Sequence, residues 1–439
     1  NMLFRKMKAE LEEWFREERN KILLIDGARQ VGKSTLIRQV GKEQFKNYIE
    51  INLLEDSLQD RLFERVRKTE DFYLQVSMIA GRRMQDRQNT LIFLDEIQEY
   101  PELLTLLKFL RQENRYTYIA SGSLLGVALA QTSSIPIGSI ETRRMYPLDF
   151  EEFLIANGFG DPAIEKLREC FEKRRSPEEA VHRRVMELFR KYLLTGGLPD
   201  AVNTYLADNN IVKVRNIQRE IRKYYSADAE KYDRERKLKI QRIYDMIPSA
   251  MENRKKRIVV KEIEGKTGKR YESYRDEFDY LITAGIALEV RAISTPVFPL
   301  DESATKNLLK LYMNDVGLLT GILYQNNIRA VLDDQRSVNL GSVYETVVAQ
   351  ELKAHGKPLY YYDNRDRGEV DFLINDFDAL SAVPVEVKSG KDYTVHSALT
   401  RFLTNEAYHV AKGYVLSNER EIRQKGKAIY LPVYLGMFL

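Results

Sequence analysis

Apolar runs alternate with amphipathic segments from residue 1 to residue 160. Apolar side chains at Leu3, Met7, Leu11 and Trp14 lie near helical spacing, so residues 1–20 predict a helix. A buried strand, a glycine-bearing turn and a helix follow in "KILLIDGARQVGKSTLIRQV", and further apolar strands follow in "LIFLDEIQEY" and "YTYIASGS". Strands that alternate with helices predict an α/β fold, with a parallel sheet covered on both faces.

The pattern changes beyond residue 160. Residues 161–194 are highly charged with helical spacing, and the glycines and proline of 196–202 interrupt them. Residues 237–251 predict a helix, a short segment follows, and 271–282 predict another helix with aromatic residues on one face. The strand "GIALEVRAI" (285–293) comes next, so the order is helix, short helix, helix, strand, as in a winged helix.

Composition limits the class of protein. Charged residues make up 31% of the chain, but the net charge is only +4, too small for a polybasic coat on nucleic acid. Residues 211–290 carry a positive excess larger than that of the whole chain, which is compatible with contacts to phosphates. The single cysteine, Cys170, and the four histidines argue against a disulfide scaffold or a structural zinc site. No apolar run reaches the roughly 18 residues of a membrane span, so we expect a cytoplasmic protein with no membrane partner.

The segment "GARQVGKS", residues 27–34, matches the pattern G-x-x-x-x-G-K-[ST] of a phosphate-binding loop. Its glycines let backbone N–H groups point at phosphate oxygens, Lys33 can reach the β and γ phosphates, and the Ser34 hydroxyl can ligate Mg²⁺. The helix that follows presents its positive N-terminal end to the same anion. The alternative is a glycine turn that binds nothing. We expect the nucleotide to contact Gly27, Ala28, Arg29, Gln30, Val31, Gly32, Lys33, Ser34 and Thr35.

Two acids end the apolar strand "LIFLDE". Asp95 can hold Mg²⁺ through water, and Glu96 can orient or deprotonate the attacking water of a phosphoryl transfer. Alone, such a pair is more often a solvated strand end or a helix cap, but its place about 60 residues after the phosphate loop favours the catalytic interpretation. Ser121 and Ser123 end the next strand, where they can either sense the γ-phosphate or serve as turn hydroxyls.

Further motifs follow in order: "IASGSLL", "MYPLDFEEFL", "YLLTGGLPDAV", "LYMNDVGLL", "GSVYETVVAQEL" and "GEVDFLI…VPVEVKSG". Together with the phosphate loop and "LIFLDEIQ", they resemble the AAA+-type ATPases of bacteria and archaea whose C-terminal half carries a nuclease-like domain of unknown function. The resemblance covers nearly the whole chain, from about Lys21 to about Leu416. The first two motifs are generic to phosphate-loop ATPases, whereas the joint order is specific.

The resemblance implies four parts with distinct folds. An AAA+-type ATPase core would occupy 1–160, a helical lid 161–210, a winged helix 211–300, and a nuclease-like domain of the PD-(D/E)XK fold 301–439. It also implies ATP and Mg²⁺ as cofactors and a homo-oligomer as the assembly.

Two further features of the nucleotide site are implied by the resemblance. The stretch Gly196-Gly197-Leu198-Pro199 would pack near the adenine ring, and Pro199 would contact the nucleotide. An arginine from a neighbouring subunit often completes such a site, for which Arg143 and Arg144 are the candidates. The alternative is a pair of solvent-facing arginines.

The winged helix raises the question of DNA binding. Such a domain reads DNA by placing its second motif helix, here roughly residues 270–283, in the major groove. That helix carries more acids than arginines, so phosphates would repel it. The basic residues near it can contact backbone phosphates without reading bases, so we expect DNA to be bound mainly through its backbone; a solvated loop or an interdomain contact is the alternative. These basic residues are Arg254, Lys255, Lys256, Arg257, Lys261, Lys266 and Lys269.

The segment "GEVDFLINDFDALSAVPVEVKSG", residues 368–390, contains two apolar strands that carry charges. Residues i and i+2 of a strand share a face, so Glu386 and Lys388 point the same way, and Asp371 lies in the neighbouring strand. By pattern alone this is a hairpin with a solvated face. Under the resemblance, Asp371 and Glu386 bind Mg²⁺, Lys388 stands beside the attacking water, and Glu345 on the helix "SVYETVVAQEL" completes the catalytic centre.

The expected function is ATP binding and hydrolysis by an enzyme that acts on DNA and carries a Mg²⁺-dependent nuclease-like domain. The alternative is an ATP-dependent regulatory or interaction protein whose nuclease-like domain binds nucleic acid or protein without cutting. A DNA-binding regulator with a static nucleotide site is disfavoured by the intact phosphate loop together with Asp95 and Glu96.

Overall fold

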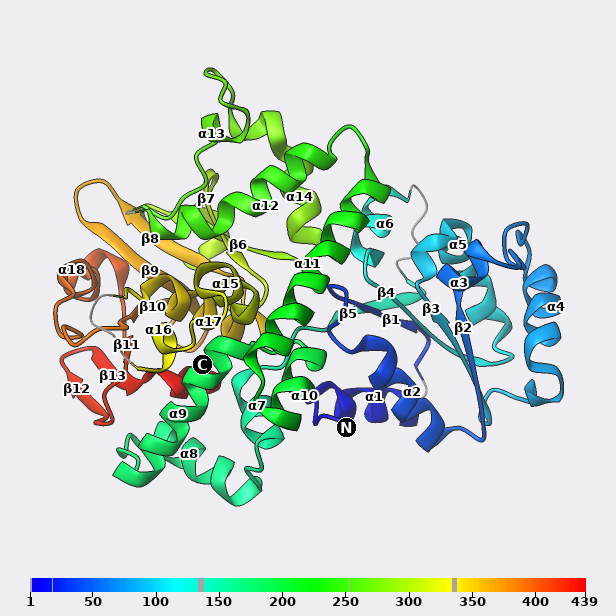
Figure 1. Ribbon diagram of the computed structural model, residues 1–439, viewed down its shortest axis with the longest axis horizontal. Coiled ribbons are helices and arrows are strands. Elements are labelled where there is room, and N and C mark those ends of the chain that lie inside the picture. The colour runs from blue at the N-terminus through cyan, green and yellow to red at the C-terminus, as the bar shows by residue number, and fades with distance from the viewer. Residues whose placement is uncertain (1, 18, 133–137, 254, 334–337) are drawn as a thin grey trace. The chain divides into compact units, whose positions relative to one another are not determined.

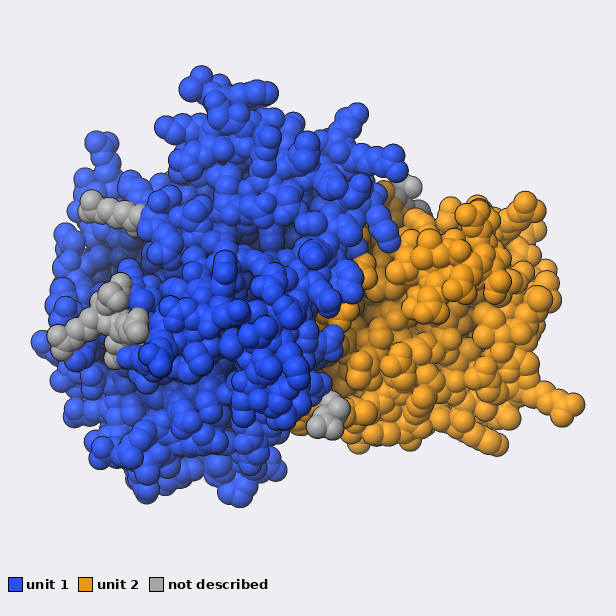
Figure 2. Space-filling model, in the orientation of Figure 1, with its two compact units in different colours: residues 1, 147–282, 286–439 blue, residues 2–146, 283–285 orange. Residues whose placement is uncertain are grey.

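The computed structural model describes residues 2–17, 19–132, 138–253, 255–333 and 338–439. The chain divides into two compact units, which Figure 2 shows in different colours. Residues 2–146 and 283–285 form one, called the N-terminal unit, and residues 147–282 and 286–439 form the other, called the C-terminal unit. Each unit contains one β-sheet, and each carries one of the two candidate centres.

Strands and helices alternate through the N-terminal unit (Figure 1). Its described strands pair in the order β2-β3-β4-β1-β5, and every pairing is parallel, which confirms the predicted parallel sheet. The elements are α1 (Met7–Arg16), β1 (Ile22–Asp26), α2 (Lys33–Gln44), β2 (Asn47–Asn52), α3 (Leu53–Leu58), α4 (Thr69–Ala80), β3 (Thr90–Asp95), α5 (Pro101–Glu113), β4 (Thr117–Gly122), α6 (Leu125–Gln131) and β5 (Ile140–Arg144).

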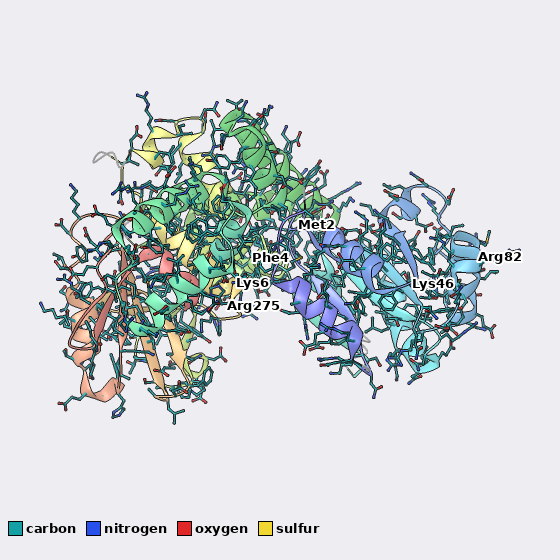
Figure 3. All side chains as sticks on the ribbon, turned by 90° about the horizontal axis from the view of Figure 1, so that it is seen from below. Met2, Phe4, Lys6, Lys46, Arg82 and Arg275 are labelled. Atoms are coloured by element: carbon teal, nitrogen blue, oxygen red, sulfur yellow. The ribbon has the colours of Figure 1, made fainter. Side chains whose placement is uncertain are left out.

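Burial explains why the central strands read as continuous apolar runs. Every residue of β1 and β3 is buried, as expected for strands of a parallel sheet covered on both faces. The register aligns Asp26 with Gly122 and Asp95 with Ser121, so the ends of β1, β3 and β4 lie at one edge of the sheet. Open α/β sheets bind ligands at this carboxyl edge. Figure 3 shows the side chains on both units and labels Lys46 and Arg82, which are exposed in the N-terminal unit.

The C-terminal unit begins with helices and returns to helices between its strands. Proline occupies the first turn of α8 and α10, where its missing N–H costs no helical hydrogen bond. The run from α12 through α13 and α14 to β6 has the order that the sequence predicts for a winged helix. The helices are α7 (Phe150–Ala156), α8 (Asp161–Lys173), α9 (Glu179–Thr195), α10 (Pro199–Asp208), α11 (Ile211–Tyr232), α12 (Lys237–Glu252), α13 (Lys261–Glu264), α14 (Arg275–Thr283), α15 (Val316–Tyr324), α16 (Arg329–Leu332), α17 (Gly341–Ala354) and α18 (Ser397–Thr404).

The described strands of the C-terminal unit form one mixed sheet in the order β12-β13-β11-β10-β9-β8-β6-β7. Neighbours β8, β9 and β10 run antiparallel, and β11 then pairs parallel to β10. Because β6 pairs with β8, the strand expected for the winged helix continues the sheet that carries the segment 368–390. The strands are β6 (Ala287–Ile293), β7 (Ala304–Met313), β8 (Tyr360–Asn364), β9 (Gly368–Asp376), β10 (Ser381–Val387), β11 (Gly413–Ser417), β12 (Arg423–Lys425) and β13 (Ala428–Pro432).

Helix α18 packs on β9 and β10 to close a hydrophobic core on this sheet. Leu399 and Phe402 of α18 are fully or almost fully buried with Tyr362 and Val370 of the strands. Within the described residues, no helix is long and apolar enough to cross a membrane. The lone cysteine, Cys170, is a free, buried thiol on α8.

Candidate functional site

The phosphate loop lies between β1 and α2, and two glycines determine its shape. Gly27 has φ 150°, and a Cβ atom placed on it would lie 2.4 Å from the carbonyl oxygen of Met145. Gly32 has φ 99° and immediately precedes α2. Both positions therefore require glycine, and the N-terminus of α2 opens directly on the loop. The turn contains Ala28, Arg29, Gln30 and Val31, and the first turn of α2 contains Lys33, Ser34 and Thr35.

Lys33 is buried beside the loop, with only 6% of its surface exposed. Its ammonium donates to the carbonyl oxygens of Gly27, at 2.8 Å, and Ala28, at 2.7 Å. Burial lowers the pKa of Lys33, and the charges of Glu96, Asp26 and Asp95 oppose that shift. Both acceptors are neutral carbonyl oxygens, so these two hydrogen bonds place no counter-charge on the ammonium.

Ser34 and Asp95 meet across the carboxyl edge of the sheet. The Ser34 hydroxyl donates to Asp95 Oδ2 at 2.8 Å, and the Ser121 hydroxyl donates to Asp95 Oδ1 at 2.8 Å. Burial, followed by the charge of Glu96, raises the pKa of Asp95, while the hydrogen bonds from Ser121 and Ser34 lower it. The hydroxyl of Ser34 and the carboxylate of Asp95 are hard oxygen donors, which suit Mg²⁺.

Glu96 is held in a turn directly after β3. Its φ is 54°, an uncommon value for a residue with a side chain. Its Oε2 atom accepts a hydrogen bond from the Ser123 hydroxyl at 3.2 Å and another from the side-chain amide of Gln98. Ser123 therefore lies beside the catalytic candidate. Gln98 was not singled out from the sequence, although its position two residues after Glu96 is a local signal that could have identified it.

Arg143 and Arg144 both make ion pairs within their own unit. Arg144 donates to the buried carboxylate of Asp26 through Nη2, at 2.7 Å, and through Nε, at 3.1 Å. Arg143 lies 3.4 Å from Glu10. The guanidinium of Arg144 thus binds the carboxylate at the end of β1. Its predicted role, completing the nucleotide site of a neighbouring subunit, would require it to leave this ion pair.

The glycines at 196 and 197 have a structural role inside the C-terminal unit. A Cβ atom on Gly197 would lie 2.1 Å from the carbonyl oxygen of Leu148, and one on Gly196 would collide with the carboxylate of Asp315. The N–H of Gly197 donates to Asp315 Oδ1 at 2.7 Å. Burial raises the pKa of Asp315 to about 6. Pro199 begins α10 in this unit, and its contact with a nucleotide stays a prediction.

Asp371, Glu386 and Glu345 come together in the C-terminal unit from β9, β10 and α17. Asp371 Oδ2 accepts a hydrogen bond from the backbone N–H of Val387 at 2.8 Å, which holds it next to Glu386. Burial, followed by the charge of Asp371, raises the pKa of Glu386 well above its ordinary value. Burial and the charge of Asp371 also raise the pKa of Glu345 to about 7. The charge of Asp371 contributes to both shifts, so its carboxylate lies near those of Glu345 and Glu386.

Three cations surround these carboxyl groups. Lys256, from the loop after α12, makes an ion pair with Glu345 Oε1, and its side chain is 23% exposed. Lys310 on β7 is buried, and its charge lowers the pKa of Glu345. Lys388 follows β10, and its charge lowers the pKa of Glu386. The sequence identified Lys388 alone as a member of this group, since Lys256 and Lys310 are remote along the chain.

Tyr312 adds a hydroxyl to the same carboxylate group. Its hydroxyl donates to Glu345 Oε2 at 3.2 Å from a fully buried position on β7. Strand β7 thus supplies Lys310 and Tyr312 to the centre that the segment 368–390 predicted. We call Glu345, Asp371, Glu386 and the side chains around them the carboxylate centre.

Lys256 and Arg257 make ion pairs inside the C-terminal unit, and their contact with DNA phosphates stays a prediction. Lys256 is directed into the carboxylate centre, and Arg257 pairs with Asp363 at 2.6 Å and with Glu369 at 3.4 Å. Both side chains are largely buried, with 23% of Lys256 and 18% of Arg257 exposed. Of the other expected contacts, Lys255, Lys261, Lys266 and Lys269 are exposed, and Arg254 lies outside the described residues.

Family models match three consecutive parts of the chain. Residues 19–154 match a model described as an AAA domain. This match covers the phosphate loop and the parallel sheet. Residues 19–154 thus have the fold of a P-loop domain of the AAA type. Residues 186–329 match a domain of unknown function (DUF8612), and residues 340–435 match another domain of unknown function (DUF4143).

Solved structures resemble the chain more loosely. A Walker-type ATPase of Pyrococcus abyssi is 15% identical, with 73% of this chain and 95% of that chain covered at a TM-score of 0.43. The ORC1 protein of Aeropyrum pernix, solved in complex with DNA, is 14% identical, with coverages of 74% and 94% and a TM-score of 0.30. No curated protein gives a significant match to the chain. The assignment of the AAA domain therefore rests on the family model and on the loop geometry.

Proposed function

We propose that the chain binds and hydrolyses ATP in its AAA domain and acts on DNA through the carboxylate centre. The hydrogen bond of 2.8 Å between Ser34 and Asp95 carries the first half of this proposal. It joins the last residue of the phosphate-loop motif to the strand-end acid, although 61 residues separate them. A glycine turn that binds nothing has no need of this pairing.

The side chains of the AAA domain divide the tasks of phosphoryl transfer. Lys33 neutralises charge on the β and γ phosphates, and the N-terminus of α2 orients them. Ser34 and Asp95 would hold Mg²⁺, which would supply positive charge to neutralise the phosphates. Glu96, fixed by Ser123, orients the attacking water and accepts its proton. If the Ser123 hydroxyl also contacts the γ-phosphate, it links the presence of that phosphate to the position of Glu96.

The carboxylate centre supports a Mg²⁺-dependent nuclease function. Glu345, Asp371 and Glu386 offer carboxylate oxygens to a divalent cation, and burial together with the charge of Asp371 raises the pKa values of Glu345 and Glu386, so a bound cation would relieve the repulsion. Asp371 and Glu386 would hold Mg²⁺, which polarises a phosphodiester and activates water. Lys388 lies next to Glu386, where its ammonium can orient that water. The order α17, β8, β9, β10, α18, β11 agrees with the proposed PD-(D/E)XK fold.

Lys256 favours a second candidate function for the same centre. Its ammonium already pairs with Glu345, and although burial opposes this, the charges of Glu345 and Asp371 raise the pKa of Lys256. A lysine so placed competes with a divalent cation for the carboxylates. In this second function the C-terminal unit binds nucleic acid or protein without cutting. The ammonium of Lys256 then takes the place of a metal ion as the counter-charge of the carboxylates.

A cleavage panel separates the two functions. The full chain is incubated with single- and double-stranded DNA and RNA, with Mg²⁺ or Mn²⁺, in the presence and absence of ATP. The first function predicts metal-dependent cleavage that Asp371→Asn removes while ATP hydrolysis continues. Absence of cleavage of every substrate, with intact ATP hydrolysis, supports the second function. Absence of ATP hydrolysis rejects the shared part of both.

A further inference from the structure

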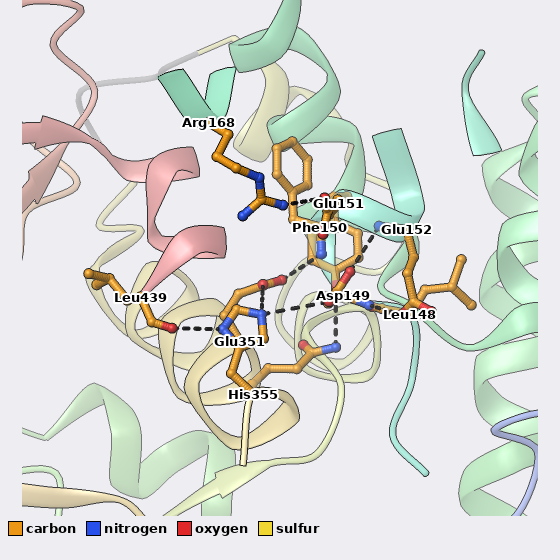
Figure 4. Close-up of polar contacts among 11 residues, drawn as sticks. Leu148, Asp149, Phe150, Glu151, Glu152, Arg168, Glu351, His355 and Leu439 are labelled. Carbon is orange, nitrogen blue, oxygen red and sulfur yellow. Dashed lines mark hydrogen bonds and ion pairs between the residues drawn. The ribbon is translucent and has the colours of Figure 1, made fainter. Parts of the chain in front are cut away.

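A second group of ligating side chains lies in the C-terminal unit, apart from the carboxylate centre. Asp149 caps the N-terminus of α7, Glu351 lies in the last turn of α17, and His355 follows that helix. Figure 4 shows the three side chains converging. One atom from each lies within 4.8 Å of the other two. Glu351 is six residues beyond Glu345 on α17, roughly 9 Å along the helix axis.

Backbone N–H groups orient both carboxylates toward the histidine. Asp149 Oδ1 accepts a hydrogen bond from the N–H of Glu152 at 2.8 Å as part of a capping box. Glu351 Oε1 accepts one from the N–H of Phe150 at 2.6 Å. The second oxygen of each carboxylate faces His355 Nε2, at 3.6 Å from Asp149 and 3.5 Å from Glu351.

A carbonyl oxygen fixes which ring nitrogen of His355 faces the carboxylates. Nδ1 lies 3.2 Å from the carbonyl oxygen of Leu439. A carbonyl can only accept a hydrogen bond, so Nδ1 carries a proton and Nε2 is the nitrogen that faces the two carboxylates. Metal-ligating histidines have this arrangement, in which the second nitrogen donates to a carbonyl or a carboxylate.

The separations discriminate between a shared proton and a metal ion. A charge-assisted N–H···O bond from an imidazolium is about 2.7–2.9 Å long, well short of 3.5 and 3.6 Å. Ligands on a tetrahedral Zn²⁺ with bonds of about 2.0–2.2 Å lie roughly 3.3–3.5 Å apart. The observed spacing is therefore closer to that of ligands around a metal.

Both carboxylates of the group are buried. Asp149 and Glu351 are 3% and 4% exposed. Buried carboxylates are costly unless a cation or a metal compensates them.

We propose that Asp149, Glu351 and His355 bind a divalent transition-metal ion, with Zn²⁺ the best match to one nitrogen and two oxygen ligands. Three protein ligands leave the fourth tetrahedral position for water. The ion joins the start of α7 to the end of α17, two elements 202 residues apart between Asp149 and Glu351. The proposal does not depend on ATP hydrolysis or on nuclease activity.

Zinc retention by the full chain tests the proposal. All proteins carry Asp371→Asn, so that the carboxylate centre contributes little. Each is incubated with Zn²⁺, desalted and analysed for metal by mass spectrometry, and Co²⁺ is used as a spectroscopic probe of ligand geometry. We expect about one equivalent of Zn²⁺ in the parent and a tetrahedral Co²⁺ spectrum, with a higher melting temperature when Zn²⁺ is present.

Matched variants give the test its controls. Glu351→Gln keeps the oxygen that accepts from Phe150, and His355→Gln removes the nitrogen ligand, so each should lower Zn²⁺ affinity at least about tenfold. His409→Ala, at an exposed histidine, should retain the metal. Circular dichroism without metal verifies that each variant is folded. Failure of the parent to retain Zn²⁺, or equal retention by folded Glu351→Gln and His355→Gln, overturns the proposal.

Discussion

The phosphate loop and the carboxylate centre each hold a lysine, and the two lysines have opposite pKa shifts. Lys33 donates to the carbonyl oxygens of Gly27 and Ala28, and burial lowers its pKa. Lys256 pairs with Glu345; burial again opposes its charge, but the carboxylates prevail and raise its pKa. The ammonium of Lys33 is thus available to an incoming anion, whereas that of Lys256 satisfies anions of its own unit.

Under the proposed function, this difference separates a site for an anionic phosphate from a site for a divalent cation. In the loop, dipoles position a positive charge, so an anionic ligand adds the missing counter-charge. In the carboxylate centre, Lys256 supplies the counter-charge, so a divalent cation must displace it. Loss of Lys33 should therefore impair the nucleotide site, whereas loss of Lys256 should strengthen cation binding at the carboxylate centre.

The largest expected effect is the loss of ATP turnover on Lys33→Ala. Removing the only ammonium that the loop motif supplies should lower the rate about 1,000-fold, because the phosphate charge is then left uncompensated. Phosphate release in steady state measures the effect. Lys46→Ala, at an exposed lysine of the same unit, is the control and should match the wild type. Equal ATP turnover in the Lys33 and Lys46 variants would contradict the assignment of Lys33 as the phosphate-binding lysine.

Asp315 shows how a buried carboxylate behaves when neutral donors hold it. Gly197, Leu318 and Gln350 donate to it, and burial raises its pKa from 3.8 to about 6. As pH rises, the carboxyl group therefore ionises in the unfolded state before it ionises in the folded state. Its cost to the free energy of unfolding is absent below about pH 4, grows between about pH 4 and 6, and is complete above that range. From the bottom to the top of that window, the free energy of unfolding of the wild type should fall by about 3 kcal/mol relative to that of Asp315→Asn. Urea unfolding at several pH values, followed by circular dichroism, measures the difference, and a pH-independent difference would contradict the assignment.

Glu96→Gln should lower ATP turnover about 100-fold while ATP still binds. The amide keeps the size of the side chain and can still bond to Ser123, but it cannot accept a proton from water. Equilibrium binding of a fluorescent ATP analogue and phosphate release together measure the two effects. Glu102→Gln, at an exposed glutamate of α5, should leave both unchanged. Normal turnover in Glu96→Gln rejects Glu96 as the base.

Lys256→Ala should strengthen Mn²⁺ binding at the carboxylate centre about tenfold, the smallest of these effects. Its removal frees Glu345 from its ion pair, and a gain of about 1.4 kcal/mol corresponds to this change in affinity. Calorimetric titration with Mn²⁺ measures it. Lys255→Ala changes the adjacent exposed lysine and should leave the affinity unchanged. Weaker binding on loss of Lys256 would show that it supports the metal site.

Sequence patterns predicted local chemistry more completely than remote chemistry. The phosphate loop and the strand-end acids follow from short motifs because one strand–turn–helix unit, or one strand end, places each of them. The parallel sheet follows from the alternation of apolar strands and helices, since both faces are buried. Gln98 was not singled out although its position two residues after Glu96 is a local signal, because a lone glutamine matches no motif of the phosphate-loop ATPases.

Remote contacts could not be read from local patterns. Lys256 lies in a basic run that reads as a phosphate-binding surface, and only the folded chain brings it to Glu345, 89 residues away. Tyr312 and Lys310 likewise reach the centre because β6 and β7 join the sheet of β8 to β10. Hydrophobic periodicity locates a strand but does not determine which sheet it joins.

Phosphate release from ATP by the wild type, Lys33→Ala and Asp371→Asn, measured side by side with Mg²⁺, tests the central claim most directly. The account predicts that the wild type and Asp371→Asn hydrolyse ATP at similar rates, and that Lys33→Ala does not. No Mg²⁺-dependent phosphate release from the wild type, or full activity in Lys33→Ala, would contradict it.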